Sequence, residues 1–256
     1  MALVTGARTV ELPGSVRAAW SDASRGDLRP RGHGCGHRDG TGLSALAADA
    51  AASSGNRVDG VFWANQVHGS RVLDVGAGAT AGRDGDTPYL SCPGAADALV
   101  SDRSGIALCV LTADCGALAL ASPEGIYAAV HAGWRGLRDG VVEAAVGRMR
   151  SWGATDVVGA LGPCIHAECY EFAGPDLDAV AAACGDAVRG TTTAGRPALD
   201  VPVGIAAALV RAGAGQVAGV DACTACDDRY FSHRARRDTG RQALVVWVAP
   251  EGGGPG

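Results

Sequence analysis

The 256-residue sequence predicts an α/β fold of the α+β kind, a single domain over residues 1–250 in which mixed β-sheets are layered with helices. Two apolar runs, 117–121 and 126–130, flank a Ser-Pro-Glu-Gly segment that is typical of a hairpin turn. The compact apolar run 106–111 predicts a buried strand, and apolar residues recur at helical spacing from 137 to 152. Hairpins mixed with helices favour mixed sheets over strict βαβ repeats.

The other elements are predicted from similar patterns. An Ala-rich stretch at 43–52 predicts a helix, and residues 58–75 predict two strands separated by a polar interruption at 65–70. The Gly-rich segment 76–94 predicts a long loop. Further predictions are strands at 157–161, 217–220 and 243–249, helices at 176–188 and 203–212, and a disordered tail at 251–256.

Composition excludes several classes of function. All 22 basic residues are Arg, which excludes chemistry that needs a lysine amine, such as that of Schiff-base enzymes, Walker-A ATPases and protein kinases. A net charge of −5 argues against a nucleic-acid partner. No membrane span or signal peptide is evident, and nine cysteines follow no disulfide framework. We therefore expect a cytoplasmic protein without membrane partners, whose oligomeric state stays open.

Three side chains predict a metal site. His68 lies in the polar cluster that interrupts a strand, and the hairpin places Cys115 opposite residue 132 or a neighbour, near His131 at the open end. One thiolate and two imidazoles suit zinc, with a fourth coordination position left for water or substrate. The alternative is that Cys115 is a small buried hydrophobic residue and both histidines are ordinary loop residues.

Residues beside this trio are candidate functional groups. The segment 133–136 leads directly into the predicted helix, so Arg135 and free backbone N–H groups could bind an anion such as phosphate. A solvated arginine at an ordinary helix start is the alternative. Asp114 is a candidate proton shuttle, although adjacent residues of a strand point to opposite faces.

Two further patterns contain cysteine. His33, Cys35 and His37 resemble a small metal clip, but Gly-rich polar loops often contain such residues. Cys223 and Cys226 form a lone C-x-x-C. As a structural zinc site it lacks the second cysteine pair that such a site needs, and as a redox pair it lacks a thioredoxin-like context. The remaining cysteines considered, interpreted as packing residues, are Cys92, Cys109 and Cys184.

Taken together, the motifs resemble those of the laccase-domain family, also called YfiH-type or multicopper polyphenol oxidase proteins. The resemblance covers roughly residues 58–248. It is carried by N-Q-V-H-G at 65–69, A-D-A at 96–98, T-A-D-C at 112–115, H-A-G-W-R-G at 131–136, G-P-C-I at 162–165, Y-E at 170–171, C-T at 223–224 and F-S-H-R at 231–234. The resemblance implies a single α/β domain and one zinc ion bound by His68, Cys115 and His131.

The resemblance also implies an enzyme that phosphorolyses purine nucleosides, chiefly adenosine, inosine and methylthioadenosine, and that deaminates adenosine. Phosphate near Arg135 would attack C1′ of ribose, and water activated by zinc would attack C6 of adenine. The motif that contains His68 makes Asn65 and Gln66 further candidate substrate contacts.

Two alternatives stay open. A copper-dependent phenol oxidase is the first, but Met1 and Met149 are the only methionines available as an axial copper ligand, and six histidines are too few for a multicopper cluster. The second is a zinc-binding accessory protein without turnover, since some family members are described as peptidoglycan editing factors. It stays open because the family's N-terminal arginine-and-glycine motif has only a poor match at 20–26, where Arg25 is left unassigned.

Overall fold

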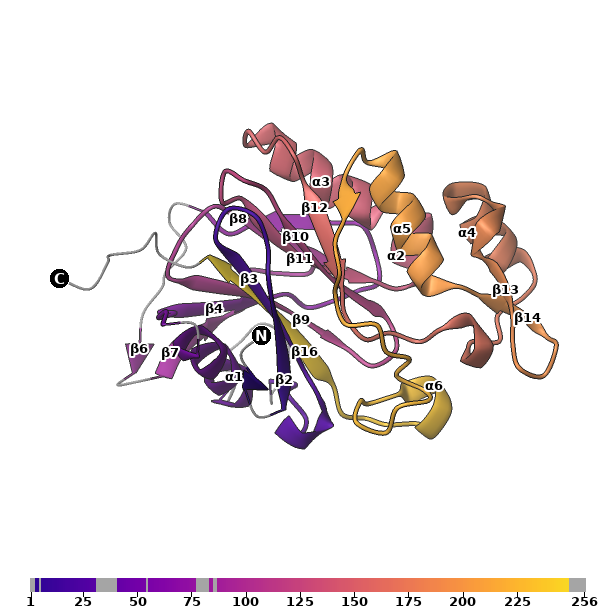
Figure 1. Cartoon of the computed structure of the whole chain (residues 1–256), viewed down its shortest axis with the longest axis horizontal. Coiled ribbons are helices and arrows are strands. Elements are labelled where there is room, and N and C mark those ends of the chain that lie inside the picture. The colour runs from indigo at the N-terminus through magenta and orange to yellow at the C-terminus, as the bar shows by residue number, and fades with distance from the viewer. Residues whose placement is uncertain are drawn as a thin grey trace.

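A computed structural model describes residues 3–4, 6–30, 41–53, 55–76, 83–84 and 87–248. Two large mixed sheets lie face to face in these residues, with helices on their outer sides (Figure 1). In spatial order, the first sheet consists of β1 (Leu3–Val4), β2 (Ala7–Glu11), β3 (Val16–Ser21), β16 (Gln242–Val248), β9 (Ile106–Thr112), β4 (Gly60–Trp63), β7 (Thr87–Ser91) and β6 (Arg83–Asp84). The second consists of β15 (Gly215–Gln216), β12 (Val158–Leu161), β10 (Gly116–Ala121), β11 (Tyr127–Ala132), β8 (Ala98–Ser101) and β5 (Val72–Asp74).

Helices cover the outer faces of the two sheets. α1 packs on the first sheet, whereas α3 and α5 pack on the second. The helices and short elements are η1 (Ala23–Arg25), α1 (Thr41–Ala52), α2 (Trp134–Arg138), α3 (Val141–Ser151), η2 (Ala167–Cys169), α4 (Pro175–Cys184), η3 (Asp186–Val188), β13 (Arg189–Thr191), β14 (Pro197–Leu199), α5 (Val201–Arg211) and α6 (His233–Arg236). Among the helices that the structure describes, none combines the length and apolar character required for a transmembrane span.

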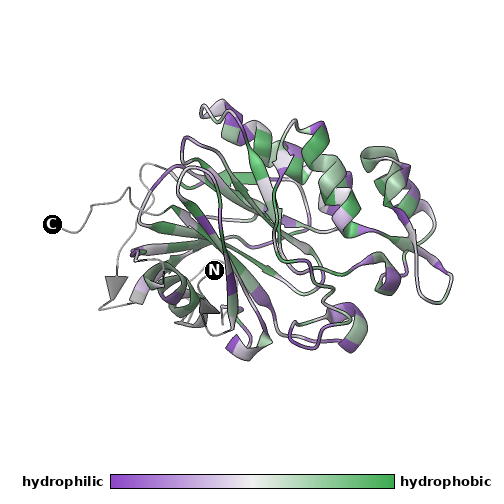
Figure 2. Cartoon of the chain, in the orientation of Figure 1, coloured by the Kyte–Doolittle hydropathy of each residue, from purple (hydrophilic) through white to green (hydrophobic). Residues whose placement is uncertain are grey.

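Alternation along β10 shows how the layers are held together. Leu118 and Leu120 pack in the core under the helices, whereas Ala117, Ala119 and Ala121 pack in the core between the sheets. Successive side chains of a strand point to opposite faces, so one strand contributes to both cores. The short alanines allow the sheets to pack closely, and Figure 2 shows hydrophobic residues running along the strands of both sheets.

Most of the predicted elements are confirmed. Mixed pairing is present as expected, since β4 is parallel to β9 whereas β16 is antiparallel to it. The Ser-Pro-Glu-Gly turn joins β10 to β11, with Gly125 at a φ of +78°. The confirmed segments also include the helices near 43–52 and 203–212 and the strands near 58–75, 106–111, 157–161 and 243–249, the last residue of which lies outside the described part of the chain. The helix predicted over 176–188 ends at Cys184, and the short turn η3 follows it. The predicted tail at 251–256 lies outside the residues that the structure describes.

The prediction of a single helix over 137–152 is wrong in one respect, because the structure has two helices in this region. α2 ends at Arg138 and α3 begins at Val141. Gly140 between them has a φ of +78°, a left-handed conformation that most side chains disfavour and that ends a helix. The apolar spacing continued across this break, so the periodicity alone did not reveal it.

The predictions for 76–94 and 217–220 are also corrected. The first segment contains β6 and β7, and β7 pairs in parallel with β4, a long-range contact that local turn residues do not reveal. The strand predicted at 217–220 is shorter and lies earlier in the chain, as β15 at 215–216. Beyond it, the chain still follows β12, because Val217 donates to Gly159 and Val220 donates to Leu161.

Gly162 generates a stability prediction. A Cβ at this position would lie 2.0 Å from the ring of Trp20, whose Nε1 donates to the Ala117 carbonyl at 3.0 Å. We expect Gly162→Ala to lower the free energy of unfolding by about 1–3 kcal/mol, as measured by urea denaturation, because the indole must move.

The control is Gly147→Ala on α3, where Gly147 is exposed and a Cβ would meet nothing within 4 Å. This variant should raise the free energy of unfolding by roughly 0.5–1 kcal/mol through helix propensity. Equal effects of the two substitutions would contradict the packing argument.

Candidate active site

The structure brings His68, Cys115 and His131 together. β10 pairs with β11 so that Gly116 is opposite Ala132, which places Cys115 one residue beyond the pair and close to His131. The ligand atoms of the three side chains lie within 4.8 Å of one another. The two imidazole rings are 4.8 Å apart, with an angle of 79° between their planes. One thiol and two imidazoles therefore face a common point, as a metal site requires.

Asp97 positions both histidines. Its side chain is fully buried, and one oxygen lies 2.8 Å from Nδ1 of His131. The same oxygen accepts from the backbone N–H of His68 at 2.9 Å, and the other accepts from that of Gly69 at 2.7 Å. When Nδ1 of His131 donates to the carboxylate, Nε2 carries the free lone pair that binds a metal.

The loop that carries His68 needs this anchor. His68 has a φ of +61°, in the left-handed region that side chains other than glycine rarely adopt. Burial alone would raise the pKa of Asp97, but its hydrogen bonds with His131, Gly69 and His68 outweigh burial and hold the pKa below its usual value. The carboxylate is thus ionised, and its charge is shared between the loop and β11.

Charge within the trio favours a thiolate. Burial would raise the pKa of Cys115, but the neighbouring His131 and His68 outweigh burial and lower it to about 6. Burial likewise opposes ionisation of His131, whereas Cys115 and Asp97 favour it and raise its pKa to about 9, so a metal that binds Nε2 must displace a proton from it. A thiolate is the form of cysteine that binds metals, so Cys115 is prepared for this role.

Gly133 leaves room above the trio. A Cβ at this position would lie 3.0 Å from Sγ of Cys115 and 3.2 Å from Cδ2 of His68. A side chain here would therefore crowd both ligands. The glycine in the H-A-G-W-R-G segment keeps access to the trio open.

Asp114 lies next to the trio but is held in a separate network. Its carboxylate accepts from the hydroxyls of Thr224 and Ser232 at 2.8 and 2.6 Å, and from the backbone N–H of Arg234 at 2.6 Å. These contacts attach the C-terminal segment to the start of β10. These hydrogen bonds give Asp114 a role in holding the 224–234 segment in place, whereas its role as proton shuttle stays a prediction.

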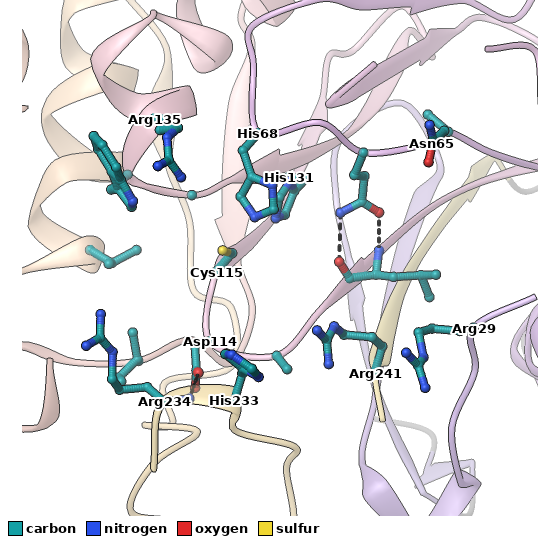
Figure 3. Close-up of a pocket in the computed structure, with 18 of the residues that line it drawn as sticks. Arg29, Asn65, His68, Asp114, Cys115, His131, Arg135, His233, Arg234 and Arg241 are labelled. Carbon is teal, nitrogen blue, oxygen red and sulfur yellow. Dashed lines mark hydrogen bonds between the residues drawn. The ribbon is translucent and has the colours of Figure 1, made fainter. Parts of the chain in front are cut away.

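Gln66 and Asn65 lie at the edge of the same cavity. The amide of Gln66 exchanges two hydrogen bonds of 2.8 Å with the backbone of Leu111 in β9, drawn dashed in Figure 3. The backbone N–H of Asn65 donates to Gly94, and its side chain is exposed. Gln66 therefore fastens the His68 loop to the first sheet, and direct substrate contacts of both residues stay predictions.

The trio lies in a cavity of about 860 Å³ that contains several arginines. Arg135 and Arg234 lie on one side of the trio in Figure 3, and Arg29 and Arg241 lie on the other. Burial and the nearby charge of Arg29 lower the pKa of Arg241. Arg29 also pairs with Asp27 at 2.7 Å, and Asp27 lines the cavity as well, so part of the positive charge on this side of the trio is already neutralised.

Aromatic side chains form another part of the cavity wall. Trp134 and Tyr170 line it, and each is paired with a cation. The guanidinium of Arg135 lies 4.3 Å from the Trp134 ring centre, and that of Arg234 lies 4.8 Å from the Tyr170 ring centre. Flat apolar faces beside cations suit a planar ring that carries a polar or anionic group.

Several functional candidates were not found from the sequence alone. Asp97 was part of a recognised motif without a role, and nothing local marked Arg29 or Arg241 as cavity residues. Arg25, which the sequence left unassigned, pairs with Asp49 at 2.7 Å and is not among the described residues that line the cavity. The candidate clip of residues 33–37 lies outside the residues that the structure describes.

The anion site predicted at Arg135 needs one correction. α2 is only five residues long, from Trp134 to Arg138, because the predicted longer helix is broken at Gly140. A helix this short adds little dipole, and anion binding by its free backbone N–H groups stays a prediction. Arg135 lines the cavity, where its guanidinium is available for an anion contact.

Comparison with known proteins gives matches along most of the chain. A family model described as multi-copper polyphenol oxidoreductase laccase matches residues 44–249. A purine nucleoside phosphorylase of Streptomyces coelicolor is 42% identical over 191 residues, which cover 73% of this chain and 75% of that protein. Another, of Streptomyces griseus, is 36% identical over 252 residues, which cover 94% and 98% of the two chains.

Solved structures agree with the fold. A protein of Neisseria meningitidis has a TM-score of 0.72 and 25% identity, covering 96% of this chain and all of that one. The YfiH protein of Bacillus licheniformis has a TM-score of 0.70 and 22% identity with the same coverage. The predicted mixed α/β architecture and the resemblance to YfiH-type proteins are thus confirmed.

Asp97 generates a prediction about metal affinity. Asp97→Asn keeps the side-chain shape but replaces one acceptor oxygen with an amide donor, so the His68 loop and His131 can no longer both be satisfied. We expect the affinity of the trio for zinc to fall about 10–100-fold, as measured by competition with a chelator.

Asp74→Asn is the control for this experiment, because Asp74 pairs with Arg148 on the surface and is not among the described residues that line the cavity. It should leave zinc affinity unchanged. Wild-type affinity in Asp97→Asn would show that the buried carboxylate does not position the ligands.

Proposed function

This chain belongs to the multi-copper polyphenol oxidoreductase laccase family, and we propose that it is a zinc-dependent purine nucleoside phosphorylase that also deaminates adenosine. The substrates proposed are adenosine, inosine and methylthioadenosine, with inorganic phosphate. The observation that carries the proposal is the convergence of His68, Cys115 and His131 in a cavity that also contains arginine and aromatic side chains. The names of the relatives from two Streptomyces species support the phosphorylase activity. A cytoplasmic location remains part of the proposal.

The donor set fits zinc better than copper. Three ligands, two imidazoles and one thiolate, leave one tetrahedral position open, as in catalytic zinc sites. A copper site of this composition usually adds a weak axial ligand such as methionine. Met149 belongs to α3 and is buried in the core between that helix and the second sheet, and Met1 lies outside the described residues. Zinc at the trio would supply Lewis acidity, which activates water for attack on C6 of adenine.

The cavity offers binding groups for both halves of the reaction. The faces of Trp134 and Tyr170 suit stacking with a planar purine, and the guanidinium groups suit a phosphate dianion. Arg135 and Arg234 lie beside these rings, so base and phosphate could be bound in the same compartment. A volume of about 860 Å³ is within the range of small-molecule sites.

Phosphorolysis then needs orientation and charge stabilisation from the chain. A phosphate oxygen attacks C1′, the bond from C1′ to N9 breaks, and the base leaves with the electron pair and takes up a proton. Arg135 would orient the phosphate through charge-assisted hydrogen bonds. The cations would also stabilise negative charge that moves from phosphate toward the base in the transition state.

The decisive experiment measures phosphate-dependent release of free base from adenosine, inosine and methylthioadenosine by protein of known zinc content. We expect release by the wild type and its loss in His68→Ala and Cys115→Ala, because each variant removes one ligand of the trio. Inosine formed from adenosine without phosphate measures deamination in the same samples.

Arg57→Ala is a matched control, because Arg57 is an exposed surface residue paired with Asp59. It should retain full activity. Stoichiometric zinc in the wild type with neither free base nor inosine formed would contradict the proposal for these substrates and would favour an accessory role.

Arg135 and Arg138 give a second, paired prediction. Arg135 lines the cavity, whereas Arg138, three residues later on α2, pairs with the adjacent Asp139 and is not among the lining residues described. Loss of a hydrogen bond to a charged group costs about 1.5–3 kcal/mol, so Arg135→Gln should raise the KM for phosphate at least tenfold. Arg138→Gln should leave it unchanged, and equal KM values in initial-rate kinetics would exclude Arg135 as a phosphate ligand.

A further inference from the structure

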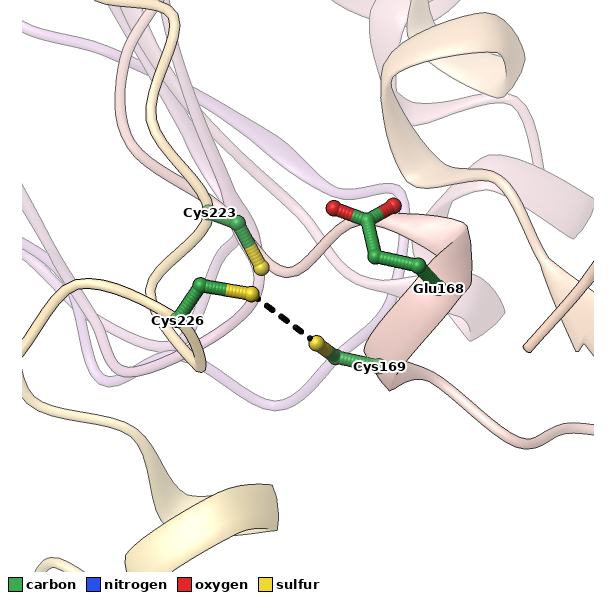
Figure 4. Close-up of side chains that lie close together, drawn as sticks. All are labelled: Glu168, Cys169, Cys223 and Cys226. Carbon is green, nitrogen blue, oxygen red and sulfur yellow. Dashed lines mark hydrogen bonds between the residues drawn. The ribbon is translucent and has the colours of Figure 1, made fainter. Parts of the chain in front are cut away.

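A second group of metal-binding side chains lies apart from the trio. It consists of Glu168, Cys169, Cys223 and Cys226, whose ligand atoms all lie within 4.8 Å of one another (Figure 4). The C-x-x-C lacked a second pair in the sequence, but the fold brings Cys169 to it from a segment more than fifty residues earlier. We propose that these four side chains form a structural zinc site.

The geometry is close to that of a zinc site. Four ligands around zinc, at about 2.3 Å for sulfur, are separated by roughly 3.8 Å in a tetrahedron. Sγ of Cys169 lies 3.1 Å from Sγ of Cys226, so modest side-chain rotation would reach the required separation. Figure 4 shows the three thiols gathered together, with the carboxylate of Glu168 beside them.

The surroundings of the group also suit a bound cation. Cys223 is buried, and its sulfur accepts a hydrogen bond from the backbone N–H of His166 at 3.4 Å. Cys169 and Glu168 are half-buried, whereas Cys226 is exposed and leaves a path for the ion. Four protein ligands leave no position for substrate, which is typical of a structural site.

The alternative arrangement is a disulfide between Cys169 and Cys226. Their sulfurs are farther apart than the roughly 2.05 Å of such a bond. A disulfide would also give no role to Cys223 and Glu168, which lie in the same group. Zinc accounts for all four side chains, so the geometry favours it.

The position of this group gives the proposed zinc a structural role. Tyr170, which lines the cavity, follows Cys169, and Thr224, which donates to Asp114, follows Cys223. An ion bound by the group would join the segment before α4 to the segment before α6. It would thereby hold one wall of the cavity in place without touching the substrate.

The first test is the zinc content of protein purified under reducing conditions without chelator, measured by elemental analysis. We expect two zinc ions per chain in the wild type, one in Cys226→Ser and one in His68→Ala, and none in the double variant. Cys226 is exposed, so its replacement by serine should leave the fold intact. The control Cys184→Ala removes a cysteine outside both groups and should retain two.

A second measurement identifies the ligands. In the His68→Ala variant, metal-free protein titrated with Co²⁺ should develop the intense sulfur-to-cobalt and visible bands of a tetrahedral thiolate site. Cys226→Ser in that background should weaken these bands strongly. Glu168→Gln should keep the sulfur-to-cobalt bands but lower the affinity for Co²⁺.

Either of two results would overturn the proposal. One is a single zinc ion per chain in the reduced wild type, lost in His68→Ala and unaffected by Cys226→Ser. The other is a Cys169–Cys226 disulfide that persists in mass spectra of protein purified under reducing conditions. Both results are independent of nucleoside turnover, so the second site can fail while the phosphorylase proposal holds, and the reverse.

Discussion

The carboxylate of Asp97 is the contact on which the candidate active site depends. It lies directly before β8, beside the loop between β4 and β5, and it is fully buried there. One of its oxygens contacts the imidazole of His131 and the backbone N–H of His68, so the ring of one histidine and the backbone of the other are held by the same atom. A buried carboxylate is expensive unless it is fully hydrogen-bonded, and this requirement gives the loop its conformation. The left-handed backbone of His68 is consistent with that constraint.

The layered fold places the trio at one edge of the two sheets, where the core between the sheets and the core under the helices both end. Along β11, Val130 packs under the helices, and the next residue, His131, lies at the end of the strand beside the cavity. The alternation that builds the cores therefore also orients a ligand. Gln66 ties the His68 loop to β9 of the other sheet, so both sheets contribute to the geometry of one site. Precision in the site thus derives from rigid strands and from a loop held at both ends.

Local patterns predicted those parts of the structure that local interactions determine. The hairpin of β10 and β11 has a strong turn signal, so the approach of Cys115 to His131 could be predicted from the sequence. The pairing of β7 with β4 and the arrival of Arg29 and Arg241 in the cavity depend on contacts between distant segments, for which one sequence carries no local signal. The same holds for Cys169, which completes a group that appeared incomplete as C-x-x-C. Gly140 could have been recognised, but the apolar period continued across it and concealed the helix break.

The absence of lysine has a consequence for how the cavity responds to acidity. Apart from the imidazoles, its cationic side chains on α2, α6 and the flanking segments are guanidinium groups, which remain protonated at any pH compatible with folding. The positive potential around a bound anion is therefore nearly constant, unlike that of a site built from amines. Each guanidinium also presents a planar fork of donors, so an oxyanion is held by direction as well as by charge. The groups whose charge changes with pH are therefore the imidazoles, the thiol and the ligand itself. As a result, the groups that attract an anionic ligand are largely different from the groups that can exchange protons with it.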